Sequence, residues 1–167
     1  MANKRNFTPE EWTKVLEGTM VAGMAVSAAD PSGLWGTLKE AFASRAALDA
    51  VKLDSGSNEL VKAIIADFET AEGRSAIQES LHKHFTGAKL PSDFVRRSLN
   101  SLREVSAIVT AKAPDDAPGF KAWLRGISQS VAEASKEGGF LGIGGVRVSD
   151  AEKATLAEIA KALGTAT

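Results

Sequence analysis

The sequence of 167 residues contains no cysteine and no tyrosine, and it has only two histidines. Without cysteine, the chain cannot form a disulfide, a thiolate nucleophile, a cysteine-ligated zinc site or an iron–sulfur cluster. No serine lies in a Gly-x-Ser-x-Gly nucleophile elbow, and no acid–base pair can be inferred from the spacing. We therefore predict a protein that is not an enzyme and binds no cofactor. The lack of cysteine agrees with a reducing cytoplasm.

The chain also lacks an excess of either charge, because 20 basic residues stand against 21 acidic ones. Proteins that bind nucleic acid usually concentrate basic residues on one face to contact phosphates. The most basic segment carries Arg96, Arg97 and Arg103, but Asp93 and Glu104 interrupt it. This pattern favours a solvated helix face, and we predict no nucleic-acid partner.

Long hydrophobic runs are missing as well. The longest weakly polar stretch, residues 18–29, is about a dozen residues and contains Thr19 and Ser27. A membrane-spanning helix needs about 20 apolar residues, so no span is expected. The first six residues are polar and do not resemble a signal peptide. We expect a soluble, cytoplasmic protein.

Apolar residues recur at helical spacing along most of the chain, and strand-like alternation is scarce. This pattern predicts an all-α fold, with residues 1–167 forming a single-domain bundle of about seven helices. The first helix begins clearly, because Thr8 is a good N-cap and Pro9 suits the first helical position. Glu11 completes a capping box with Thr8, and the helix should end near Ala29.

The other expected helices follow from apolar periodicity and from turn residues. Ser57 is expected to cap the third helix, and Gly73 to break or kink the chain before the fourth. Gly87 occupies a typical position for a C-terminal glycine. Ser149 and Glu152 form a capping box for the last helix. Apolar positions of the later helices span residues 34–48, 60–68, 77–85, 94–109, 120–131 and 156–163.

Two segments resemble the tellurite-resistance B-like proteins. Residues 21–30, followed by Gly33, are similar to the alanine-rich helix of that family, which ends in Ala-Asp-Gly. Residues 148–152 are similar to the Ser-x-x-Glu opening of a later helix. The resemblance implies an all-helical fold of about seven helices and a role in bacterial stress responses. It also implies an acidic patch for a divalent metal or a partner, and the positions carried over are Asp30, Asp150 and Glu152.

A glycine-rich segment precedes the last helix and is the most unusual part of the sequence. It does not match the dinucleotide-binding fingerprint, because the pattern needs a preceding strand and a glycine where Arg147 stands. Its apolar residues favour a loop packed against the bundle, and a loop that contacts a partner or ligand is the alternative. The residues are Gly138, Gly139, Phe140, Leu141, Gly142, Ile143, Gly144 and Gly145.

The two histidines, His82 and His84, lie two positions apart and would point about 200° apart on a helix. They therefore cannot share one metal ion from that segment. Glu79 and His82 have the Glu-x-x-His spacing of di-iron bundles, but a second copy of the motif is missing. We expect Glu79 and His82 to be solvated residues on a helix face.

The leading hypothesis is a non-enzymatic stress-response or interaction module that binds a protein partner. One alternative is a divalent-metal-binding protein that uses Asp30, Asp150 and Glu152. Another is a carrier of a small ligand or lipid in a cavity between helices, favoured by Met20, Met24 and the glycine-rich segment.

Overall fold

The computed structural model describes residues 2–29, 58–134 and 148–165. Within these ranges the chain forms one short 3-10 helix and six α-helices, without a strand. The prediction of an all-α fold is thus confirmed, and the helix expected over 34–48 lies outside the described residues. The elements are η1 (Lys4–Asn6), α1 (Pro9–Ala29), α4 (Glu59–Phe68), α5 (Ala71–Phe85), α6 (Pro91–Lys112), α7 (Ala117–Ala134) and α8 (Asp150–Leu163).

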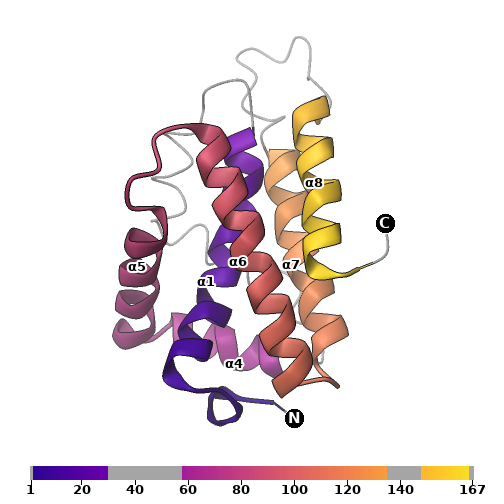
Figure 1. Ribbon diagram of the computed structural model, residues 1–167. Coiled ribbons are helices and arrows are strands. Elements are labelled where there is room, and N and C mark those ends of the chain that lie inside the picture. The colour runs from indigo at the N-terminus through magenta and orange to yellow at the C-terminus, as the bar shows by residue number, and fades with distance from the viewer. Residues whose placement is uncertain (1, 30–57, 135–147, 166–167) are drawn as a thin grey trace.

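Helix α1 is the centre of the bundle and contacts α5, α6, α7 and α8 (Figure 1). Every residue of α1 from Val15 to Ala28 is buried. A helix that is buried on all sides must be surrounded by other elements, and small residues allow its neighbours to approach closely. Its main neighbour, α6, runs antiparallel to it, since Glu11 pairs with Lys112 at 3.5 Å while Glu17 contacts Ser101.

Two capping boxes predicted from the sequence are confirmed. The amide of Glu11 donates to Thr8 Oγ1 at 3.2 Å, and the Thr8 amide donates to Glu11 Oε2 at 2.8 Å. This backbone hydrogen bond, helped by Lys112, lowers the pKa of Glu11. Ser149 and Glu152 make the equivalent pair of bonds, 3.2 and 2.8 Å long, at the start of α8. The sequence thus fixes where α1 and α8 begin.

The cap of α4 differs from the prediction. Asn58, not Ser57, is the N-cap, and its Oδ1 accepts from the Val61 amide at 3.0 Å. The Asn58 amide group also donates to the carbonyl of Asp116 at 2.9 Å. This second bond ties α4 to the start of α7, so a distant contact selects the cap.

The predicted break at Gly73 is wrong, because α5 begins at Ala71 and includes Gly73 in its first turn. Thr70 caps the helix, accepting from the Gly73 amide at 2.9 Å. A Cβ at Gly73 would lie 2.1 Å from the carbonyl oxygen of Asp67. Glycine is therefore needed where α5 turns tightly against α4. Gly87 ends this region with φ +79°, as expected for a C-terminal glycine.

Candidate functional site

The structure describes two of the three predicted acidic site residues and none of the predicted glycine-rich loop. Asp30 and the whole segment 138–145 lie outside the described residues. Asp150 is fully exposed and pairs with Lys153 at 3.4 Å. Glu152 is buried, and its carboxylate accepts hydrogen bonds from the amide and hydroxyl of Ser149. Of the two described acidic residues, Asp150 thus belongs to a surface ion pair and Glu152 to a helix cap.

Metal-ligating side chains are dispersed in the described ranges. No group of three or more histidine, aspartate or glutamate residues is placed there to hold an ion. Glu79 forms an ion pair with Lys83 at 2.7 Å, and the hydrogen bond from Lys83 lowers the pKa of this carboxyl group. His82 is exposed, as the sequence predicted.

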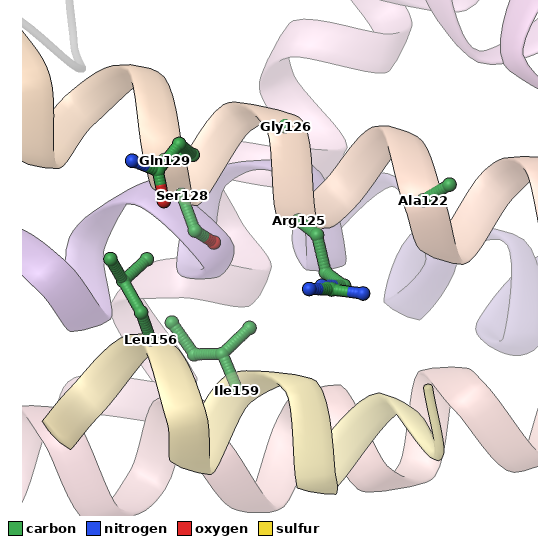
Figure 2. A pocket seen from close by; sticks show the side chains of 7 residues that line it. All are labelled: Ala122, Arg125, Gly126, Ser128, Gln129, Leu156 and Ile159. Atoms are coloured by element: carbon green, nitrogen blue, oxygen red, sulfur yellow. The ribbon is translucent and has the colours of Figure 1, made fainter. Parts of the chain in front are cut away.

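A cleft of about 280 Å³ lies between α7 and α8 and is called here the α7–α8 cleft (Figure 2). Leu156 and Ile159 project into it from α8, and the guanidinium of Arg125 lies in the space between the two helices. The cleft thus combines an apolar floor with a polar rim. Its lining residues are Ala122, Arg125, Gly126, Ser128, Gln129, Leu156 and Ile159.

One face of α7 forms the wall of the cleft. Ala122, Gly126 and Gln129 are exposed and lie four and three residues apart, a spacing that places them on one side of a helix. A Cβ built at Gly126 would meet nothing within 4 Å, so the space beside it is open. Glycine inside a helix costs about 1 kcal/mol relative to alanine. An unfavourable glycine inside a helix is therefore the sequence feature that could have indicated this site, and it was not used in the prediction.

The buried residues of α7 fix the helix to the core. Phe120 and Leu124 are fully buried, and the hydroxyl of Ser128 donates to the carbonyl of Ala22 in α1 at 2.9 Å. The same hydroxyl lies 3.1 Å from the carbonyl of Leu124. The cleft wall is therefore held rigidly while its outer residues remain accessible.

A second hollow, of about 460 Å³, lies between the N-terminal segment and α4. Its polar side chains bind one another. Lys4 pairs with Asp67 at 3.3 Å, and the indole nitrogen of Trp12 donates to the same carboxylate at 2.7 Å. These bonds join the N-terminus to α4, and we assign this hollow a structural role.

A polar cluster around one buried carboxylate joins α1, α5 and α6, and it is called here the Glu17 cluster (Glu17, Ser80, His84 and Ser101). Glu17 is only 3% exposed. Ser101 donates to its Oε1 at 2.8 Å, Ser80 donates to its Oε2, and His84 Nδ1 lies 3.6 Å from Oε1. The other ring nitrogen of His84 lies 3.0 Å from the carbonyl of Arg97. These contacts of His84 were not predicted from the sequence.

Two serines of α6 offer a matched test of this cluster. Ser98 is 0% exposed, and its hydroxyl has no hydrogen-bond partner in the part of the chain that the structure describes. Ser101, one turn later, donates to the buried carboxylate of Glu17. Urea unfolding should show that Ser101→Ala lowers the free energy of unfolding by about 1.5–3 kcal/mol, as expected for loss of a hydrogen bond to a charged group. Ser98→Ala should be neutral or stabilising, and equal losses in both variants would contradict this assignment.

Comparison with family models, with curated proteins and with solved structures gives no match to this chain. Among the described helices, none is both long enough and apolar enough to cross a membrane.

Proposed function

We propose that this chain is a non-enzymatic interaction module whose α7–α8 cleft receives an apolar side chain of a protein partner. The observation that carries the proposal is the open space beside Gly126, in the middle of a rigidly anchored helix. An alanine there would favour the helix by about 1 kcal/mol. A glycine that leaves room over an apolar floor is better explained by an occupant than by the fold alone.

The shape of the cleft favours a protein partner. Its volume of about 280 Å³ is near the lower limit of the roughly 300–1,000 Å³ typical of small-molecule pockets. Protein interfaces commonly centre on a few anchor side chains that fill such hollows, surrounded by a polar rim. Leu156 and Ile159 would contact the anchor, and Arg125 and Gln129 would form the rim.

Several observations favour this reading over the alternatives. Buried or capped carboxylates in the described residues have structural partners, as at Glu17, Glu11 and Glu152. Met20 and Met24, which suggested a carrier cavity, belong to the packed core. The resemblance to tellurite-resistance B-like proteins implies the same class of activity, partner binding in a bacterial stress response in the cytoplasm.

The test replaces Gly126 with leucine, which should fill the cleft without disturbing the core. We expect native mass spectrometry of protein purified gently from its own host to find a stoichiometric partner with the wild type. That partner should be lost with Gly126→Leu, because the side chain occupies the anchor position.

Ala154→Leu is the matched control, because Ala154 is exposed on α8 and points away from Leu156 and Ile159. This variant should keep the partner. Binding that survives in Gly126→Leu, or that is lost equally in both variants, would contradict the proposed function. A metal-sized mass removed by a chelator would instead favour the metal-binding alternative.

A further inference from the structure

Helix α5 buries few of its residues, and its apolar Leu81 and Phe85 pack against the core while only partly buried. Of its fifteen residues, only Gly73 and Ile77 are buried. It lies at the edge of the bundle beside α1 (Figure 1). Burial of apolar surface is the main source of helix stability in proteins. The small buried apolar surface of α5 therefore leaves part of its attachment to other contacts.

Polar contacts supply much of that attachment. Ser80 and His84, one turn apart on α5, both face the carboxylate of Glu17. Arg97 of α6 reaches back to the end of α5, donating to the carbonyls of His84 and Thr86 at 2.8 and 2.9 Å. The stacked rings of Phe85 and Phe94, with centroids 5.0 Å apart, lie beside these bonds.

The Glu17 cluster makes detachment of α5 cheaper than detachment of an apolar helix. A buried carboxylate loses its hydration, and its protein hydrogen bonds return only part of that free energy. If α5 moves away, water reaches Glu17 and replaces Ser80 and His84. Glu17 would keep its bond to Ser101, so α1 and α6 would remain joined while α5 is released.

We propose that α5 is a latch, which opens as a unit from the α1–α6 face while the rest of the bundle stays folded. The Glu17 cluster sets how often it opens. Proteins open locally in cooperative segments, and segments with few buried apolar contacts open with the lowest free energy. The latch is independent of the α7–α8 cleft, which lies on helices that contain no member of the Glu17 cluster.

Native-state hydrogen exchange on the full chain tests the latch. Amides of residues 75–83 should show an opening constant at least about tenfold larger than those in the middle of α1 and α6. Ser80→Ala removes one bond to the carboxylate and should raise the opening constant of α5 by about tenfold again. The protection of α7 and α8 should not change.

Glu17→Gln provides a second variant that keeps the side-chain shape, and it should slow exchange selectively in α5, because burial of a neutral amide costs less hydration than burial of a carboxylate. Glu104→Gln is the control, because Glu104 pairs with Lys14 on the exposed surface between α1 and α6. It should leave the rates of α5 unchanged. The latch is overturned if α5 exchanges only together with α1 and α6, or if Ser80→Ala speeds exchange equally in all helices.

Discussion

Replacement of Gly73 by alanine should lower the free energy of unfolding by about 3 kcal/mol, at the upper end of overpacking effects. The added Cβ would lie 2.1 Å from the backbone oxygen of Asp67. Backbone cannot rotate away as a side chain can, so the turn between α4 and α5 must open. The hydrogen bond from the Gly73 amide to Thr70 should be lost with it. Urea unfolding followed by circular dichroism measures the change.

The control is the same glycine-to-alanine substitution at Gly126, where nothing lies within 4 Å of the new Cβ. Alanine favours a helix more than glycine does, so Gly126→Ala should raise the free energy of unfolding by about 0.5–1 kcal/mol. The two variants must therefore differ in sign. A stable Gly73→Ala variant would show that the α4–α5 turn does not need glycine.

Truncation of Phe120 to alanine should cost about 3–5 kcal/mol, as expected for a large core side chain that leaves a cavity. Phe120 is the largest fully buried side chain among the described residues, and its ring centroid lies 6.1 Å from that of Trp123. It anchors the start of α7, and therefore the wall of the cleft, to the core. The loss should appear as a lower urea midpoint with an unchanged slope.

Leu90 offers the contrasting case, because it is 61% exposed. Leu90→Ala removes a large apolar side chain from the surface and should change stability by less than about 0.5 kcal/mol. If Phe120→Ala were as mild as Leu90→Ala, the described core around α7 would be wrong.

Local chemistry explains which parts of the fold could be predicted. The Thr8 and Glu11 pair sits within one turn, as does the Ser149 and Glu152 pair, so each capping box can be read from four residues. The apolar periodicity of α6 and α7 likewise depends only on the helical repeat. Such features follow from sequence because their partners are close neighbours in the chain.

The features that sequence reasoning missed depend on distant residues. Glu17 lies in the buried part of α1, and its partners Ser80 and Ser101 lie 63 and 84 positions away. The spacing of apolar residues in α5 could not show that His84 faces this carboxylate while His82 faces solvent. The α7–α8 cleft depends on the separation of two helices, which no pattern within either helix determines. The sequence could show that Gly126 is an unfavourable residue inside a helix, but it could not show the open space beside that glycine.

Site-directed photocrosslinking can show whether the α7–α8 cleft binds a protein partner. A photoreactive side chain placed at Ala122, on the cleft wall, is compared in the native host with one placed at Ala154, on the far face of α8. We expect the side chain at position 122 to form a covalent adduct with one partner, and we expect Gly126→Leu to abolish that adduct. Ala154 should yield no such adduct. The same adduct from both positions, or none from Ala122 in folded protein, would contradict the claim.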